Sequence, residues 1–328
     1  MIRMVLLLLL LIAALAAAAL SHGDHPFAWS ELASVLTGRP TATRQAELVV
    51  MDLRLPRLLL AFLVGAALAV AGAGAQAILR NPLAEPGLLG INAGAGLAAM
   101  VVMVGLPSAP ISLLPVAGFL GASAMAAAIY LLAWRGGTTP LRLILIGIGL
   151  GSVAMAGTAL VSTLGDIRDV QRALIWLAGS VHHANWMGVQ LLALWLAPPM
   201  ALVMLATREL DLIGLGDLPA RGLGQRVDLI RGMMVLLCTA MAGAAVSAAG
   251  LIGFVGLIAP HAARRLVGPS HARLIPITAL LGGALVMAAD FTGRSIAAPL
   301  QLPAGLFTAL IGAPFFAYLL WGRRHGFS

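Results

Sequence analysis

Long apolar stretches separated by short polar segments run along the whole chain. Ten of them are predicted as helices, near residues 4–20, 58–79, 87–106, 113–134, 143–165, 186–206, 228–250, 252–267, 274–290 and 303–321. A helix of about 20 apolar residues crosses the hydrocarbon core of a bilayer. Spanning strands would be about ten residues long and would alternate in polarity, whereas these runs are unbroken. The pattern predicts an all-α integral membrane protein with about ten transmembrane helices.

Two of the runs differ from the others. The run 252–267 is short and contains Pro260, so it is predicted as a broken or partial span. The first run, Met1 to Leu20, has one Arg followed by apolar and small residues, which is also the pattern of a cleaved signal peptide. We expect a retained first helix, with the signal peptide as the open alternative.

Composition narrows the class further. Of 328 residues, 61% are apolar and 10% are charged, against about 25% charged in a soluble domain. Lys is absent, so all 20 basic residues are Arg. A phosphate-binding P-loop requires a Lys, so ATP hydrolysis must occur on another polypeptide, and this chain is not expected to be an enzyme. The only cysteine, Cys238, lies within an apolar run and indicates neither a disulfide nor a metal cluster.

The distribution of Arg predicts the orientation. With the N-terminus inside, 13 Arg fall in inner segments and 7 in outer segments. Positive residues concentrate on the cytoplasmic side, so both termini are predicted to be cytoplasmic. The longest outer loop is 21–57 and the longest inner polar segment is 207–231. Neither is long enough for a second soluble domain, so residues 1–328 are predicted to form one membrane domain.

Small residues recur at four-residue spacing within two of the runs. Gly65, Ala69 and Ala73 form one such series, and Gly147 and Gly151 form another. This spacing lets helix backbones approach closely in lipid. We expect close packing inside one subunit, and a contact between two subunits is the alternative.

Three longer motifs carry a family resemblance. The first joins Arg54-Leu-Pro-Arg57 to the stretch Gln76-Ala-Ile-Leu-Arg-Asn-Pro-Leu-Ala-Glu-Pro-Gly-Leu-Leu-Gly90. The second is Gly250-Leu-Ile-Gly-Phe-Val-Gly-Leu-Ile-Ala-Pro-His-Ala-Ala-Arg264. The third is Leu302-Pro-Ala-Gly-Leu-Phe-Thr-Ala-Leu-Ile-Gly-Ala-Pro-Phe-Phe316. In this order and spacing, they resemble the ferric-siderophore, heme and cobalamin permease family of ABC importers.

The resemblance implies a fold, partners and a location. The fold would be the BtuC-like type II importer permease, with ten helices per subunit and a pathway between two subunits, here expected to be a homodimer. Two P-loop ATPase subunits would bind ATP and Mg below, and a periplasmic substrate-binding protein would dock above. The chain itself would bind no cofactor and no nucleic acid. It would lie in the bacterial inner membrane and carry an iron chelate. A ferric siderophore is the favoured substrate, and heme and cobalamin are the alternatives.

The inner segment 207–227 is the predicted coupling segment. Gly214, Gly216, Gly222 and Gly224 break it into two short amphipathic pieces, because Gly interrupts helices and permits sharp turns. The alternative is a plain polar loop. The resemblance implies that the ATPase is contacted through Leu215, Gly216, Asp217, Ala220, Arg221, Gly222, Leu223 and Gly224.

Two inner turns resemble the cytoplasmic gate of the family. One is Asn81-Pro82-Leu83 and the other is Thr139-Pro140-Leu141. Proline stiffens such turns, and leucine can seal a pore by excluding water. Pro140 replaces the small hydroxyl residue expected in the family, which weakens the second assignment.

On the outer side, Arg54, Arg57 and Arg294 oppose the positive-inside bias. The resemblance implies that they face acidic side chains of the binding protein, as charge pairs that speed and orient encounter. Anchoring to lipid headgroups is the alternative. Asp290 is expected at the outer interface near Arg294, one helical turn on.

His182 and His183 are adjacent in an outer segment that also contains two Trp. On a helix, neighbouring side chains point about 100° apart, so joint binding of one metal ion is not expected. Interfacial polar residues in an aromatic belt are the favoured interpretation, and contact with substrate stays open.

Two rival classes remain. A proton-coupled secondary transporter would need buried ionisable residues, and only Asp290 is a candidate within the runs. A non-transporting membrane scaffold would not need the coupling segment or the gate-like turns.

Overall fold

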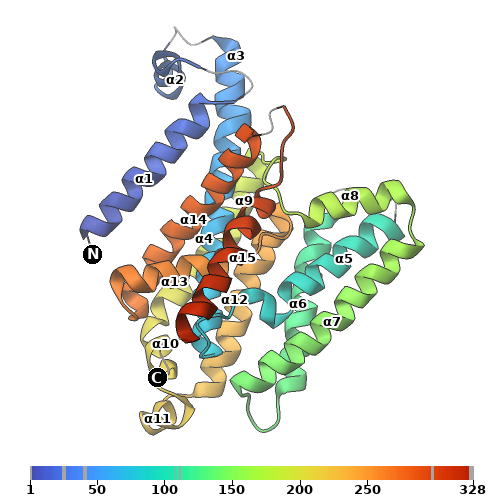
Figure 1. Ribbon diagram of the computed structural model, residues 1–328, viewed down its shortest axis with the longest axis vertical. Coiled ribbons are helices and arrows are strands. Elements are labelled where there is room, and N and C mark those ends of the chain that lie inside the picture. The colour runs from blue at the N-terminus through green and yellow to red at the C-terminus, as the bar shows by residue number, and fades with distance from the viewer. Residues whose placement is uncertain are drawn as a thin grey trace.

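Each of the ten apolar runs contains one helix of the fold (Figure 1). The computed structural model describes residues 2–23, 27–39, 43–106, 108–110, 112–296 and 299–324. The ten helices are α1 Ile2–Ser21, α4 Leu55–Ile78, α5 Ile91–Gly105, α6 Leu113–Ala133, α7 Pro140–Leu164, α9 Trp186–Leu205, α12 Val227–Ala249, α13 Val255–Val267, α14 His271–Ile296 and α15 Ala304–Arg324. The described residues contain no strand, so the predicted all-α class is confirmed.

Seven helices in the described part of the chain are long and apolar enough to cross a membrane. They are α1, α4 with its extension from Arg44, α6, α7, α9, α12 and α14. Two apolar helices, α5 and the stretch Ala304–Leu319 of α15, are shorter. Helix α13 has only 13 residues, which confirms the predicted partial span.

The break before α13 is made by glycine rather than by proline. Helix α12 stops at Gly250, whose φ is +71°, a conformation that costs glycine least. A Cβ there would lie 2.2 Å from the carbonyl oxygen of Trp176. The chain then stays non-helical to Phe254, while Pro260 lies inside α13. The prediction of a partial span was therefore right, but its reason was wrong.

Helix α4 lies at the centre and packs against α9, α12, α13 and α14. Its small residues allow this. A Cβ on Gly65 would lie 2.1 Å from the carbonyl oxygen of Gly282, and one on Gly72 would lie 2.0 Å from that of Gly256. A Cβ on Gly282 would in turn meet that of Ala69 at 2.3 Å. The series Gly65, Ala69, Ala73 thus serves packing within the subunit, as expected.

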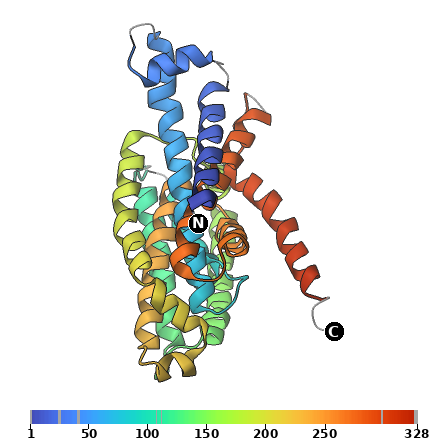
Figure 2. The ribbon, with the colours of Figure 1, turned by 90° about the vertical axis from the view of Figure 1, so that its left-hand side faces the viewer.

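The second small-residue series is divided. A Cβ on Gly147 would lie 2.1 Å from the carbonyl oxygen of Leu88, whereas Gly151 has nothing within 4 Å. Most of α7 is exposed. Helix α15 also leans away from the bundle toward its C-terminal end (Figure 2). These two helices offer apolar surface that the described part of this chain does not cover.

Seven short helical elements complete the described part of the fold. Two of them, α10 Thr207–Gly214 and α11 Asp217–Gly222, are the two pieces predicted for the coupling segment. The other five were not predicted: α2 Trp29–Leu36, α3 Arg44–Glu47, the π-helical turn η1 Leu48–Arg54, the 3-10 turn η2 Pro86–Leu89 and α8 Ile167–Leu177. Single side chains start two of them. Thr43 Oγ1 accepts from the N–H of Ala46 at the start of α3, and Asp166 accepts from that of Arg168 at the start of α8. The predicted outer loop 21–57 is thus largely helical where it is described; residues 24–26 and 40–42 of it lie outside the described part.

Candidate functional site: an inner coupling surface and an outer ion-pair cluster

The predicted coupling segment forms two short helices at one end of the molecule, at the bottom of Figure 1. We call this end the inner end, after the orientation predicted from the Arg distribution. Helices α10 and α11 are separated by Leu215 and Gly216. Gly216 has a φ of +113° and Gly224, after α11, a φ of +85°. Both values favour glycine. The predicted pair of helical pieces with glycine turns is therefore confirmed.

Three leucines of this segment point away from the protein. Leu215, Leu218 and Leu223 are 61%, 82% and 65% exposed. Ala220 is fully buried and faces the protein interior. The sequence-based set of coupling residues omitted Leu218, the most exposed of the three. Exposed apolar side chains on a polar segment are typical of a surface that another protein covers.

Hydrogen bonds hold the segment against the bundle. Asp211 of α10 accepts from the N–H of His271 at 2.9 Å and from Ser270 Oγ at 3.3 Å, at the start of α14. Gln225 Nε2 donates to Glu209 Oε2 at 2.7 Å. The carboxylate of Asp211 therefore satisfies one of the N–H groups that the start of α14 leaves unpaired, that of His271. The three leucines therefore belong to a segment that hydrogen bonds hold in place, and not to an unsupported loop.

The two gate-like turns have defined backbones. Asn81 Oδ1 accepts from the N–H of Leu83 at 3.0 Å, which is a local Asx turn. Thr139 caps α7 by accepting from the N–H of Arg142 at 3.4 Å. Pro140 takes the first position of α7, where proline is favoured because no backbone N–H is needed there.

The structure places these turns apart. Asn81 and Pro82 line an inner hollow of about 540 Å³ together with α10 and the α13–α14 turn. Thr139, Pro140 and Leu141 begin α7 and are not among the residues of that hollow. Leu141 is 65% exposed. A gate role for both turns stays a prediction.

At the opposite end, which we call the outer end after the predicted orientation, Arg57 forms a buried ion pair with Asp290. The Arg57 Nη2 atom lies 2.8 Å from Asp290 Oδ1, and Nε lies 2.9 Å from Oδ2. The two side chains are only 10% and 8% exposed. Arg57 Nη1 also contacts His182 Nδ1 at 3.1 Å and donates to Gln301 Oε1. This outer cluster joins α4, α14 and the loops before α9 and α15.

The pairing corrects two expectations. Asp290 was expected near Arg294, but its partner is Arg57, 233 positions away in the sequence. Arg54 and Arg57 were expected to be exposed, but each is only 9% exposed. A guanidinium that is buried against its own chain presents little charge to a partner. Docking of the binding protein through these residues stays an untested prediction.

Arg54 and Arg294 both hold the end of α1. Arg54 Nη1 donates to the carbonyl oxygen of Leu20 at 2.5 Å, and Arg294 Nη2 donates to that of Ala19. Carbonyls in the last turn of a helix lack partners within the helix, and cations are favoured there. The two guanidiniums therefore fix α1 to α4 and α14.

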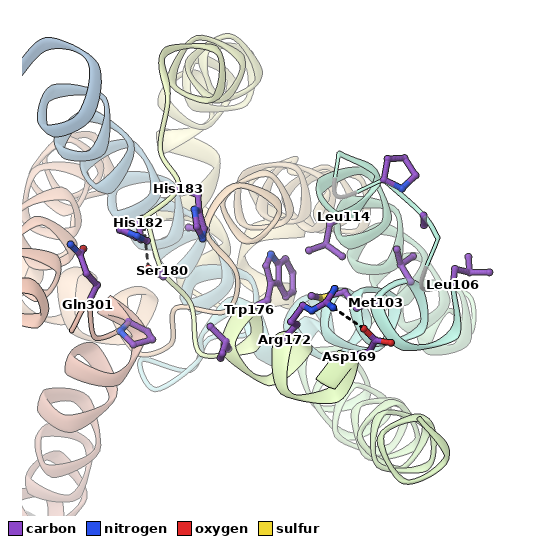
Figure 3. A pocket seen from close by; sticks show the side chains of 16 residues that line it. Met103, Leu106, Leu114, Asp169, Arg172, Trp176, Ser180, His182, His183 and Gln301 are labelled. Carbon is purple, nitrogen blue, oxygen red and sulfur yellow. Dashed lines mark hydrogen bonds and ion pairs between the residues drawn. The ribbon is translucent and has the colours of Figure 1, made fainter. Parts of the chain in front are cut away.

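An outer hollow of about 360 Å³ lies beside the outer cluster (Figure 3). Its walls are largely apolar, with the ion pair of Arg172 and Asp169 at 3.5 Å on α8. His182 and His183 sit in a turn before α9, with ring centroids 4.9 Å apart. The helical geometry assumed for them is thus wrong. Among the described residues, no group of three or more His, Cys, Asp or Glu could hold a metal ion.

The contact between Arg57 and His182 requires a neutral imidazole. A guanidinium N–H can donate to Nδ1 only when that nitrogen is unprotonated. Burial lowers the pKa of His182, and so do the charge of Arg57 and that of His183, while Asp290 and Gln301 oppose them. A lowered pKa means that the unfolded chain binds the proton first. The stabilisation by His182 is thus present above its ordinary pKa of about 6.5 and is lost as the pH falls through the lower folded value.

We expect His182→Gln to flatten the pH dependence of thermal stability between about pH 7.5 and 5.5. Gln can accept from Arg57 but does not titrate, so its contact survives acid. The measurement is the melting temperature of the purified chain in detergent across this range. His183→Gln, one position away, is the matched control and should keep most of the wild-type slope, because burial and Arg57 still lower the pKa of His182. An equal acid-induced fall in wild type and His182→Gln would contradict this role.

Together, the buried small-residue helix α4 and the many apolar spans define a multi-pass membrane protein. Comparison with known proteins identifies its class. The sequence profile of the FecCD transport family matches residues 7–322, and the chain belongs to that family.

Individual relatives agree with this assignment. The chain is 45% identical over 276 residues to the Fe(3+)-citrate import system permease protein YfmE of Bacillus subtilis, covering 84% of this chain and 82% of the relative. It is 43% identical over 285 residues to the probable siderophore transport system permease protein YfhA of the same organism, covering 85% and 83%.

A solved structure confirms the fold. It is described as an inward-facing conformation of a metal-chelate type ABC transporter and superposes with a TM-score of 0.88 at 28% identity, covering 98% of this chain and all of that one. The predicted permease fold is confirmed. Asp290, paired with Arg57, is accounted for without a proton relay.

Proposed function

We propose that this chain is the membrane-spanning subunit of an ABC importer that carries an iron(3+) chelate, a ferric siderophore or ferric citrate, across the bacterial inner membrane. The named relatives that transport such chelates support the substrate class. Two separate ATPase subunits bind ATP and Mg and drive the cycle. A second permease subunit completes the pathway, and a periplasmic binding protein delivers the chelate.

The exposed leucines on the coupling segment carry this proposal. Leu215, Leu218 and Leu223 protrude from an anchored pair of helices. The chain has no Lys for a P-loop of its own, so an ATPase must bind from outside. Burying one leucine side chain stabilises a complex by about 1.5–3 kcal/mol. A rigid base reduces the ordering cost of docking.

We expect Leu218→Ser to weaken ATPase binding at least tenfold, since about 1.4 kcal/mol corresponds to a factor of ten. The measurement is co-purification with the cognate ATPase, followed by uptake of radiolabelled ferric citrate or ferric siderophore into vesicles holding the binding protein. Leu164→Ser is the matched control. Leu164 is the last residue of α7, away from the coupling segment, and it is 78% exposed. It should assemble and transport like wild type.

Two results would count against the proposal. Unchanged ATPase recovery with Leu218→Ser would remove the coupling surface from this segment. Uptake of heme or cobalamin, with no uptake of ferric citrate or a ferric siderophore, would change the substrate class and leave the permease role intact.

A further inference from the structure

Five side chains of alternating charge are linked in series at the inner end of the molecule, and two of them belong to α11. In order they are Arg80, Asp217, Arg231, Asp228 and Arg221. Arg231, near the start of α12, lies in the middle and has no exposed side-chain surface. Its Nη2 lies 2.8 Å from Asp217 Oδ1, and its Nη1 lies 3.9 Å from Asp228 Oδ1.

The same guanidinium reaches a third element. Arg231 Nη1 donates to the carbonyl oxygen of Thr138 at 2.6 Å. Thr138 N in turn donates to Asp228 Oδ1 at 2.9 Å. Thr138 precedes Thr139, which caps α7. Two residues of α12, Arg231 and Asp228, therefore hold the loop between α6 and α7. Within Arg231, Nη1 contacts that loop and Nη2 contacts Asp217, the first residue of α11.

The other inner turn reaches the same carboxylate. Arg80 follows α4 and directly precedes the turn Asn81-Pro82-Leu83. Its Nη2 lies 3.9 Å from Asp217 Oδ1. Both turns that resemble a gate are thus connected to Asp217, although they line different parts of the inner end. Arg231 makes the closer and fully buried connection.

We propose that Arg231 is a positioning residue that transmits movement of α11 to the start of α7. The inference rests on the proposed function, because α11 moves only if an ATPase docks on it. Separating α11 from the α6–α7 loop would leave a buried guanidinium without one of its partners, which is strongly unfavourable. The two elements therefore move together. The neighbouring pair of Arg221 and Asp228 is half exposed on its Arg side, and such pairs hold weakly.

The test separates ATP hydrolysis from transport. In the reconstituted complex with ATPase and binding protein, Arg231→Gln should keep ATPase assembly and ATP hydrolysis within about twofold of wild type while uptake per ATP falls at least tenfold, about 1.4 kcal/mol or more of lost coupling. Arg231→Lys should fall between the two, because an ammonium keeps the charge but cannot reach both partners as a planar fork does.

Two further variants sharpen the result. Arg273→Gln removes an exposed Arg from the same end of the molecule and should keep the wild-type ratio of uptake to ATP. Arg80→Gln removes the longer link to Asp217, whose Arg is 40% exposed, and should lower uptake per ATP less than Arg231→Gln does.

Each contrary outcome has a distinct meaning. An unchanged ratio in Arg231→Gln overturns the inference, and so does a fall of uptake and hydrolysis in equal proportion. Failure of both Arg231 variants to accumulate in the membrane assigns Arg231 to folding alone and also overturns it. If Leu218→Ser binds the ATPase normally, the docking proposal fails by a separate measurement.

Discussion

Arg57→Ala is expected to destabilise the folded chain by about 3–5 kcal/mol, the usual cost of leaving a buried charge without its partner. Asp290 is 8% exposed on its side chain and would lose all three hydrogen bonds from the guanidinium. The same change also removes the contacts to His182 and Gln301. The measurement is chemical or thermal unfolding of the purified chain in detergent, together with its level in the membrane.

Two comparisons make this prediction specific. Replacing both partners, Arg57→Met with Asp290→Leu, should cost much less than the single change, because no uncompensated charge remains. Arg172→Ala removes an outer ion pair whose Arg is 69% exposed and should cost at most about 1 kcal/mol. If Arg57→Ala proves as stable as Arg172→Ala, the buried cluster is not what holds this end together.

The second large effect is expected from Gly72→Ala in α4. The added Cβ would lie 2.0 Å from the carbonyl oxygen of Gly256 and 2.4 Å from its Cα. Both are backbone atoms, so no side chain can rotate away, and α4 and α13 must separate. Overpacking usually costs about 1–3 kcal/mol and occasionally more, and we expect the upper end here. Unfolding in detergent and the amount of protein in the membrane report the change.

Gly149→Ala provides the matched control for this substitution. Gly149 lies in α7 with nothing within 4 Å of an added Cβ. Alanine is the better helix former by about 1 kcal/mol, so this variant should be as stable as wild type or more so. Normal stability of Gly72→Ala would mean that α4 and α13 are not packed as closely as the structure has them.

The apolar runs were enough to predict where the helices lie, because a bilayer demands length and hydrophobicity above all. The half-length of α13 was also predictable, although Gly250 rather than Pro260 makes the break. The extension of α4 through α3 and η1 was not predicted. Its sequence, Arg44 to Arg54, is polar enough to read as a loop, and tertiary contacts such as the burial of Ala46 and Val50 decide otherwise.

The two-helix form of segment 207–227 was predictable because glycines interrupt it, and Gly216 and Gly224 have the positive φ values that such turns need. The partners of buried charges were not. Nothing local links Arg57 to Asp290, or Arg231 to Thr138, since they are 233 and 93 positions apart. The number of Arg in each loop predicted which side of the membrane the loop faces. It gave no information on which guanidiniums already have hydrogen-bond partners within the chain.

The length of the α4 helix has a consequence for the outer surface. From Arg44 to Ile78 the backbone is helical over 35 residues, which at 1.5 Å per residue is about 50 Å. A hydrocarbon core is about 30 Å thick. The helix is therefore about 20 Å longer than the core, so it must either extend beyond the lipid or cross it at a tilt. Glu31 of α2 accepts a 2.9 Å hydrogen bond from Thr43, the residue that precedes this helix. If the helix extends on the side predicted to be outer, α2 lies beyond the lipid, beside the end of a helix that continues into the centre of the bundle.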